Sequence, residues 1–360
     1  MKLFLNGYFY RNLGDDLFFH IIANRYPQHQ FYAMIHGDHA HAYQGVPNVK
    51  VLPQTKALRG LDKVLYKLSP SMSLYAIQGK KTDANILIGG SMFMEMHDDG
   101  SDIARLAQMP QNYKKLFIMG VNFGPHKTEA YKQACESYLS TATDVCFRDK
   151  TSYQHFSQLP NTRVGSDIVF GIEKLCPKAE MQENTCLISV MDFGRKPSLA
   201  AYKEDYLQFL KKQVLHQQAL GRQVVLVSFS QAEGDEAAIS QLLEYLPHQS
   251  KEAVETLCYD GANWKAVCEK ISAAACLIAT RFHSMVLGLS YGVPTIAISY
   301  SNKTLQVLQD LEVAHKAILP EQLNGLEEEQ ISPIADVCTD CLKESAEKHF
   351  EKLDQFLETF

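Results

Sequence analysis

The chain has 360 residues, 46% of them hydrophobic and 21% charged, a composition typical of a globular protein with room for two domains. Its formal net charge of −6 argues against a general nucleic-acid binder, because such proteins carry a basic surface. No apolar run reaches the roughly 18–20 residues that a membrane-spanning helix needs. The opening stretch "MKLFLNGYFYRNLGDD" lacks the continuous apolar core of a signal peptide and predicts a first β-strand instead.

The first half of the chain alternates apolar runs with stretches of helical periodicity. Strands are predicted at 2–7, 30–35, 85–90, 115–120 and 144–148, and helices at 14–27 and 126–142. Strands that alternate with helices in this way are typical of βαβ units and a parallel sheet.

A second alternating set begins after residues 164–185, whose weak periodicity predicts a linker or crossover. Its strands are predicted at 186–191, 222–229, 254–259, 276–280 and 293–300, with helices at 202–219, 234–246, 262–274, 284–291 and 340–360. The two sets predict an α/β fold with two doubly wound, Rossmann-like domains that face a central cleft. We expect the domains at 1–175 and 176–325 and a helical tail at 326–360.

The nine cysteines are scattered, and several lie inside apolar runs, where cysteine behaves as a small hydrophobic residue. Only Cys338 and Cys341 form a C-x-x-C, with no second pair to complete a zinc site. This usage is typical of a reducing compartment, so a cytoplasmic location is expected.

The stretch "CLIATRFHSMVLGLSYGVPTIAISY" places Arg281 and His283 between an apolar strand and a short helix. Ser284 is expected to cap that helix, whose N-terminal N–H groups, together with the arginine and the imidazole, would form an anion site with a proton donor. Alternatively, Arg281 pairs with a core carboxylate and His283 is structural. We favour the anion site, because ligands of doubly wound sheets bind at the carboxyl ends of the strands.

Other loops after strands carry further candidates for ligand binding. Gly89 and Gly90 follow one strand and allow a ligand to approach the backbone closely. Arg148 ends another strand and is a second candidate for binding an anion, and Asp167 lies in the segment "VGSDIVF". Asp16, after the first strand, is equally well explained as a helix-capping residue and as a ligand of an acceptor.

Two further stretches contain residues that can bind ligands. Asn302 and Lys303 lie at an expected helix start, where phosphate could bind. His36, His39 and His41 lie close together, but a loop without a partner motif is a weak metal site, and no metal is predicted.

Taken together, the motifs resemble the polysaccharide pyruvyl transferase family. The resemblance rests on "NLGDD", "LIGGSMF", "GVNFGP", "FRDKTSY", "GSDIVF" and above all "TRFHSMVLGLSYGVPTIAISYSNK", in the family's order from about residue 6 to about residue 311. Arg281 and His283 match the family's R-x-H pair, and Arg148 matches the arginine of its R-D-x-x-S-Y segment. The chain departs from the family in having a Gly-Gly-Ser loop and in carrying Asp192 where an arginine is common.

The resemblance implies a GT-B-like architecture and transfer of a pyruvyl group from phosphoenolpyruvate to a sugar of a surface polysaccharide, as a ketal. It places the acceptor on the first domain and the donor on the second, with no cofactor required. His283 would be the general acid–base group, Arg148 and Arg281 would bind the donor, and Asp16, Asp98 and Asp167 would orient the acceptor or act as base. We expect Arg281→Ala and His283→Ala to abolish transfer while the chain still folds.

Two alternatives to this function remain open. One is a nucleotide-sugar glycosyltransferase on the same fold, and the other is a carbohydrate-binding protein without catalysis. A lipid-linked glycan acceptor would bring the enzyme to the inner face of the membrane as a peripheral contact, but no strong amphipathic basic helix is predicted for that contact.

Overall fold

The computed structural model describes residues 1–69, 72–109, 114–335 and 337–359, which fall into two units. The first unit comprises Met1–Tyr10, Phe18–Ile168 and Leu342–Phe360, and the second comprises Arg11–Leu17 and Val169–Cys341. Neither unit is one continuous stretch of the chain. A short piece after the first strand joins the second unit, and the end of the chain returns to the first.

The first unit contains a seven-stranded parallel sheet in the order β3-β2-β1-β4-β5-β6-β7. In chain order the strands are β1 (Lys2–Asn6), β2 (Gln30–His36), β3 (Val49–Gln54), β4 (Ala84–Ile88), β5 (Leu116–Val121), β6 (Asp144–Phe147) and β7 (Thr162–Val164). Residues of β4 and β5 are buried throughout, as expected for strands that are covered on both faces.

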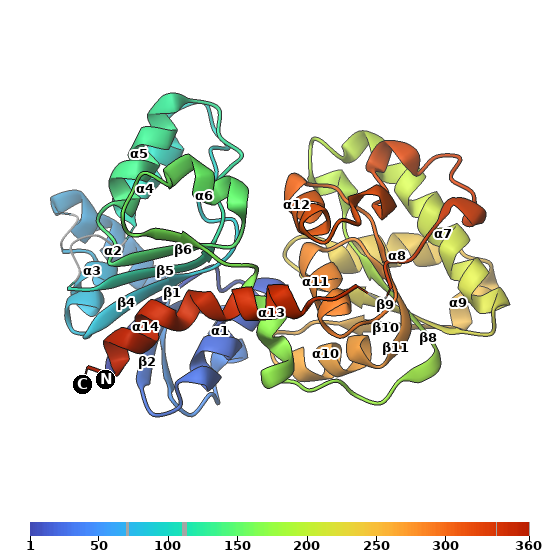
Figure 1. Cartoon of the computed structure of the whole chain (residues 1–360), viewed down its shortest axis with the longest axis horizontal. Helices are drawn as coiled ribbons and strands as arrows, with labels where there is room; N and C mark the ends of the chain where they lie inside the picture. Colours follow the sequence, from blue (N-terminus) through green and yellow to red (C-terminus); the bar gives the residue numbers. More distant parts are fainter. Residues whose placement is uncertain (70–71, 110–113, 336, 360) are drawn as a thin grey trace. The chain divides into compact units, whose positions relative to one another are not determined.

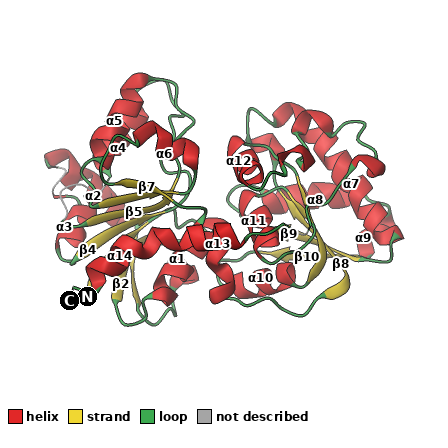
Figure 2. Cartoon of the chain, viewed as in Figure 1, coloured by secondary structure: helices red, strands yellow, loops and turns green. Residues whose placement is uncertain are grey.

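Helices cover both faces of this sheet (Figures 1 and 2). Those of the first unit are α1 (Leu13–Arg25), α2 (Lys56–Leu68), α3 (Leu74–Lys80), α4 (Ser101–Gln108), α5 (Glu129–Leu139), α6 (Lys150–Phe156), α13 (Asp340–Glu347) and α14 (Glu351–Leu357), except that α1 up to Leu17 and α13 up to Cys341 belong to the second unit. Figure 1 shows α4, α5 and α6 on one face and α1 and α14 on the other. Apolar side chains of α5 and α6 form a common core with β4, β5 and β6.

The second unit contains a five-stranded parallel sheet in the order β10-β9-β8-β11-β12. Its strands are β8 (Gln182–Val190), β9 (Gln223–Ser228), β10 (Val254–Cys258), β11 (Ala274–Ala279) and β12 (Thr295–Ala297). Both sheets thus extend from their first strand in two directions, which is the Rossmann-like, doubly wound arrangement.

The helices of the second unit are α7 (Lys203–Ala219), α8 (Asp235–Tyr245), α9 (His248–Glu252), α10 (Trp264–Ser272), α11 (Phe282–Ser290) and α12 (Asn302–Asp310). Apolar residues of α7 and α8 pack on one face of the sheet and bury the side chains of β8, β9 and β11 (Figure 2). In the part of the chain that the structure describes, no helix is long and apolar enough to cross a membrane.

The strands and helices predicted from the sequence are confirmed, with shifted boundaries. The helix predicted at 284–291 begins two residues earlier, at Phe282. The predicted linker at 164–185 is wrong at its end, because β8 already begins at Gln182, where its N–H bonds to the Ala273 carbonyl. The helix predicted at 340–360 forms as α13 and α14, joined by a short 3-10 turn at Lys348–Phe350.

The switch point of each sheet is the gap beside its first strand, where the connections diverge. In the second unit this gap lies between β8 and β11, so Asp192 and Arg281 follow the two strands that border it. In the first unit it lies between β1 and β4, so Gly89 and Gly90 lie at its edge. Ligands of doubly wound sheets bind at such points.

The C-terminal helices are anchored to the first unit by a buried histidine. His349 is 1% exposed, its Nδ1 accepts the Gly120 N–H at 3.1 Å, and its Nε2 donates to the Ser166 carbonyl at 2.7 Å. Because one ring nitrogen accepts and the other donates, the bound imidazole is neutral. Burial lowers the pKa of His349 from 6.5 to about 4, although the Ser166 carbonyl acts in the opposite direction.

We expect acid to weaken the first unit through His349. The unfolded chain takes up a proton near pH 6.5 but the folded one only near pH 4, so the stabilisation is complete above pH 6.5 and is lost as the pH falls toward 4. Lowering the pH from 7 to 5 should cost about 2 kcal/mol from this residue. Urea unfolding followed by far-UV circular dichroism should show this loss in the wild type and a smaller one in His349→Gln.

The single tryptophan supplies the control for this experiment. Trp264 lies in α10 of the second unit, so its fluorescence reports that unit's unfolding. The His349→Gln substitution should leave the pH dependence of the fluorescence transition unchanged. An equal pH dependence of the circular dichroism transition in both proteins would refute the assignment.

Candidate functional site

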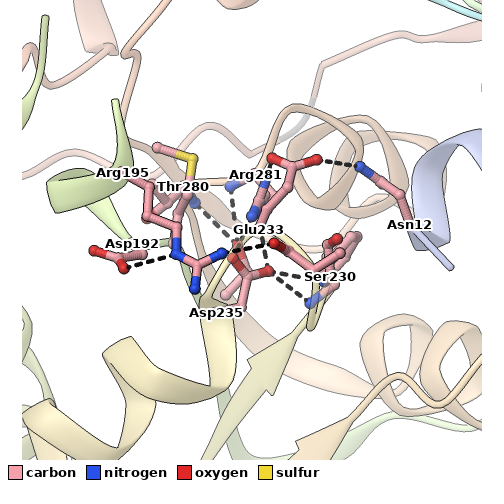
Figure 3. A network of polar contacts seen from close by, with 12 residues as sticks. Asn12, Asp192, Arg195, Ser230, Glu233, Asp235, Thr280 and Arg281 are labelled. Carbon is pink, nitrogen blue, oxygen red and sulfur yellow. Dashed lines mark hydrogen bonds and ion pairs between the residues drawn. The ribbon is translucent and has the colours of Figure 1, made fainter. Parts of the chain in front are cut away.

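A buried ion-pair network lies at the carboxyl end of the sheet in the second unit (Figure 3). Arg281, which follows β11, is 6% exposed. Its guanidinium binds Asp235 through Nε at 3.1 Å and through Nη2, and it binds the Glu233 carboxylate through Nη1 at 2.5 Å. Asp235 is fully buried and also accepts the Phe229 and Ser230 N–H groups at 3.0 and 2.9 Å.

The electrostatics of this network favour a permanently charged arginine. Burial alone would lower the pKa of Arg281, but Asp235 and Glu233 outweigh it and raise the pKa above its usual value. Burial would raise the pKa of Glu233, yet Arg281, Lys196 and Asn12 lower it overall. Asp235 is so deeply buried that its pKa is raised, although Arg281 and the two backbone N–H donors act in the opposite direction.

The structure therefore shows the alternative arrangement, in which Arg281 pairs with core carboxylates. Its guanidinium is already engaged by two carboxylates, so an incoming anion would have to displace one of them. Of the two, Glu233 is the more accessible, with 32% of its side chain exposed.

The predicted cap at Ser284 is wrong. The N-cap position of α11 is Arg281, and Ser284 lies one turn inside, where its hydroxyl donates to the Arg281 carbonyl at 2.7 Å. The Ser284 and Ser189 hydroxyls lie 2.7 Å apart, and the Ser189 oxygen also accepts the Thr280 and Arg281 N–H groups at 3.1 Å. Two buried serines thus join the end of β8 to the start of α11.

The segment "NLGDD" belongs to the same network although it lies far away in sequence. Asn12 donates to the Glu233 carboxylate at 2.8 Å, and the Leu13 N–H bonds to the Phe229 carbonyl at 3.0 Å. Asp16 is fully buried and accepts the Tyr259 phenol at 2.7 Å. Burial and this carboxylate raise the pKa of Tyr259, so its proton stays in place as the donor. The geometry makes Asp16 an internal anchor of α1.

His283 is packed against the backbone of this segment. A Cβ at Gly14 would overlap the imidazole, with Nδ1 the nearest atom, so glycine is the residue that allows α1 to approach the ring. The ring also contacts Phe282 edge-on, with centroids 5.0 Å apart. His283 is partly exposed, whereas its neighbours Arg281 and Ser284 are buried. It is therefore the more exposed residue of the Arg-x-His pair, although its Nε2 atom is buried.

Two lysines add positive charge to the second unit. Lys196 is partly buried, and its ammonium lies 4.7 Å from the centre of the Tyr300 ring. Burial lowers the pKa of Lys196, and Arg281 acts in the same direction while Glu233 opposes both. Lys303 lies over the Phe282 ring at 5.2 Å, in α12, which begins at the exposed Asn302. The helix start expected near Lys303 is confirmed.

The first unit has a separate polar cluster around Arg148. Its guanidinium binds the Asp167 carboxylate through Nη1 at 3.0 Å and the Asn122 side-chain oxygen through Nη2 at 2.5 Å, and its side chain is 3% exposed. A Cβ at Gly90 would collide with the guanidinium. The predicted residues Gly89, Gly90, Arg148 and Asp167 are thus brought together, but the arginine is again paired with a buried carboxylate.

The acidic loop after Gly90 serves mainly local structure. The Glu95 carboxylate accepts the Lys127 and Thr128 N–H groups and the Thr128 hydroxyl at 2.5–2.7 Å, which fixes the start of α5. Asp98 is exposed and pairs with the Lys127 ammonium at 2.7 Å. Within the described ranges no three His, Cys, Asp or Glu residues are placed to hold a metal ion, and this includes His36, His39 and His41.

Several residues of the network were not predicted as site residues. Glu233 and Asp235 lie in a polar loop with no motif around them, and Lys196 resembles a surface lysine in the sequence. The one signal in the sequence was Asp192, noted above as a departure from the resembled family. In the structure Asp192 accepts the Gly194 N–H at 2.9 Å and lies 3.7 Å from Arg195 (Figure 3).

Comparisons with known proteins place the chain in a family. A sequence model of the polysaccharide pyruvyl transferase family matches residues 12–302. The amylovoran biosynthesis protein AmsJ of Erwinia amylovora is 23% identical over 263 residues, which make up 66% of this chain and 61% of that protein.

Solved structures with the same fold include two proteins in complex with UDP. The UDP-GlcNAc 2-epimerase of Methanocaldococcus jannaschii, in complex with UDP-GlcNAc and UDP, matches with a TM-score of 0.61 and 8% identity over the whole of both chains. Anabaena HepE in complex with UDP matches with a TM-score of 0.51 and 14% identity, again over both whole chains. At these identities the likeness shows the fold alone, which is GT-B-like.

The ion pair changes what we expect of Arg281→Ala. Removing the arginine leaves Asp235 buried without its partner, which should lower the free energy of unfolding of the second unit by about 3–5 kcal/mol. Glu233→Gln is the matched comparison, because it removes only the more exposed carboxylate and should cost about 1 kcal/mol or less. Urea unfolding followed by Trp264 fluorescence measures both. Equal losses in the two variants would contradict a supporting role for the pair.

Proposed function

Because this chain belongs to the polysaccharide pyruvyl transferase family, we propose that it transfers the pyruvyl group of phosphoenolpyruvate to a sugar of a surface polysaccharide or its precursor. The product is a ketal, in which two sugar hydroxyls are joined to the central carbon of the pyruvyl group. The observation that supports this best is the Arg281-x-His283 pair at the switch point of the second sheet, inside the region that matches the family.

The reaction balances without a redox partner. A proton adds to the methylene carbon of phosphoenolpyruvate, and positive charge develops at the central carbon. One sugar hydroxyl attacks that carbon, and a second hydroxyl then replaces the phosphate. The two sugar hydroxyls lose one proton each. One of these protons balances the proton added to form the methyl group, and the departing phosphate takes up the other.

His283 is the residue that we assign to proton transfer. His283 is the more exposed residue of the motif, and it lies in the first turn of α11, whose N-terminal end favours an anionic ligand. We assign Arg281 a positioning role, because Asp235 and Glu233 hold its guanidinium while its backbone forms the start of the helix that carries His283.

Other groups of the second unit must then supply the positive charge that binds phosphoenolpyruvate. Lys196 lies beside the Arg281–Glu233 pair and Lys303 lies over Phe282, next to His283, so both are candidates to bind its carboxylate or phosphate. Arg148, with Asp167, Gly89 and Gly90, remains a candidate binding group of the first unit. The acceptor there stays a prediction, as does a cytoplasmic location.

Calorimetric titration with phosphoenolpyruvate tests the donor. The wild type should bind it, and Lys196→Gln should weaken the binding at least tenfold, because a hydrogen bond to a charged group is worth about 1.5–3 kcal/mol. Lys251→Gln, which removes an exposed lysine of α9, is the control and should bind like the wild type.

The same titration with uridine diphosphate and guanosine diphosphate distinguishes a pyruvyl transferase from a nucleotide-sugar glycosyltransferase. Tight binding of either nucleotide, without binding of phosphoenolpyruvate, would move the chain to the nucleotide-sugar glycosyltransferases. The alternative of a binding protein without catalysis predicts that His283→Gln changes no measurable reaction.

The packing of His283 against Gly14 predicts a specific loss of activity. In Gly14→Ala the new methyl group must displace the imidazole, so release of phosphate from phosphoenolpyruvate in the presence of acceptor glycan should fall about a hundredfold or more. Gly60→Ala is the control, because a Cβ at that position would have no atom within 4 Å. Unchanged activity of Gly14→Ala, in a protein with wild-type circular dichroism, would remove His283 from the proposed role.

A further inference from the structure

Helix α2 in the first unit carries an apolar stripe that the described residues of the chain leave exposed. None of its 13 residues is buried. Leu61 is 48% exposed, Val64 56% and Leu68 71%, and Leu58 is exposed as well. Large apolar side chains occur singly on most protein surfaces, but a contiguous row along one helix marks an interaction site.

The helix separates apolar from basic residues with the period of an α-helix. At 100° per residue, its apolar positions fall within an arc of about 120°, and its four basic residues fall within about 80° on the opposite side. The apolar positions are Leu58, Leu61, Val64, Leu65 and Leu68, and the basic ones are Lys56, Arg59, Lys63 and Lys67.

The charge of the helix contrasts with that of the whole chain. The protein has a formal net charge of −6, whereas α2 has four basic residues and one acidic residue, Asp62. The Asp62 carboxylate accepts the Leu74 N–H at 2.5 Å, at the start of α3, so it serves a local turn. Lys56, Lys63 and Lys67 are exposed and accessible to a partner.

We propose that α2 is a docking element for an anionic lipid bilayer, lying in the plane of the interface with its leucines among the acyl chains and its lysines at the headgroups. A helix with an apolar face, a lysine-rich polar face and too little length to span is the kind that binds at this depth. Long lysine side chains can extend toward the phosphates while their methylene groups remain in the apolar layer. The attraction is local to α2, because the rest of the chain is acidic.

The charge pattern argues for a bilayer rather than a second copy of the chain. A second copy packed on the leucines would leave the opposite side of α2, with four basic residues against the single acidic Asp62, without an anionic partner. An anionic bilayer supplies both an apolar phase and negative charge. The inference does not rest on the proposed reaction, although a lipid-linked acceptor would give it a purpose.

Vesicle sedimentation tests the proposal with the full chain. The wild type should sediment with phosphatidylcholine vesicles that contain phosphatidylglycerol, much less with phosphatidylcholine alone, and less at high salt. The double variants Leu61→Gln/Leu68→Gln and Lys63→Glu/Lys67→Glu should each lower the partition coefficient at least tenfold. All four side chains are exposed, so both variants should keep the wild-type circular dichroism spectrum.

Matched controls come from exposed positions in the second unit. Leu220→Gln removes an apolar side chain that is 56% exposed, and Lys251→Glu reverses an exposed charge, and both should bind vesicles like the wild type. The proposal is overturned if the wild type ignores phosphatidylglycerol or if the α2 variants bind as well as the controls. It is also overturned if light scattering shows that the wild type is a dimer, and that the α2 variants are monomers which still bind vesicles like the wild type. None of these results bears on donor binding, which the calorimetry measures without lipid.

Discussion

The ion pair between Arg281 and Asp235 is the interaction on which the arrangement of the second unit depends. Both groups are buried, and a buried charge is costly unless a partner and hydrogen bonds satisfy it. Asp235 is satisfied by the arginine and by two backbone N–H groups after β9. Arg281 also binds Glu233, and Glu233 in turn accepts a hydrogen bond from Asn12. Because these contacts define the start of α11, the position of His283 follows from them.

A comparable pair occurs in the first unit. Arg148 follows β6 and is held by Asp167 and Asn122, as Arg281 follows β11 and is held by Asp235 and Glu233. In each unit, therefore, an arginine at a strand's carboxyl end is neutralised by a carboxylate of its own unit. An arginine in such a place suggests an anion site in the sequence, but in this protein its first task is to fix loops. The groups left to meet a ligand are those with greater exposure, above all His283.

The sequence predicted what depends on local pattern. Fully buried strands such as β4 and β5 are continuous apolar runs, and α1 carries two aspartates in its first turn, where they favour a helix start, so these elements could be found. Strand β3 was missed because it contains Pro53, which is tolerated here at the edge of the sheet. Helix α2 was missed although its basic and apolar residues alternate with helical period.

The site was predictable only in part, because its key contacts are long-range. Arg281 and His283 could be singled out from their place after a strand, but nothing near them in sequence indicates Glu233 or Asp235. Gly14 and His283 are likewise far apart in sequence, and their packing arises only when α1 meets α11. The start of α11 was misplaced because Ser284 is a favoured capping residue, whereas the fold uses it to bond Ser189.

Hydrogen exchange measured by mass spectrometry in the presence of phosphoenolpyruvate tests the central claim most directly. The claim is that the donor binds in the second unit, where the Arg281–Asp235 pair fixes His283. It predicts slower exchange in the peptides that cover residues 11–17 and 280–290, with no change in those that cover 89–91, 148 and 167. Slower exchange confined to the latter set would move the donor to the Arg148 cluster and contradict the account.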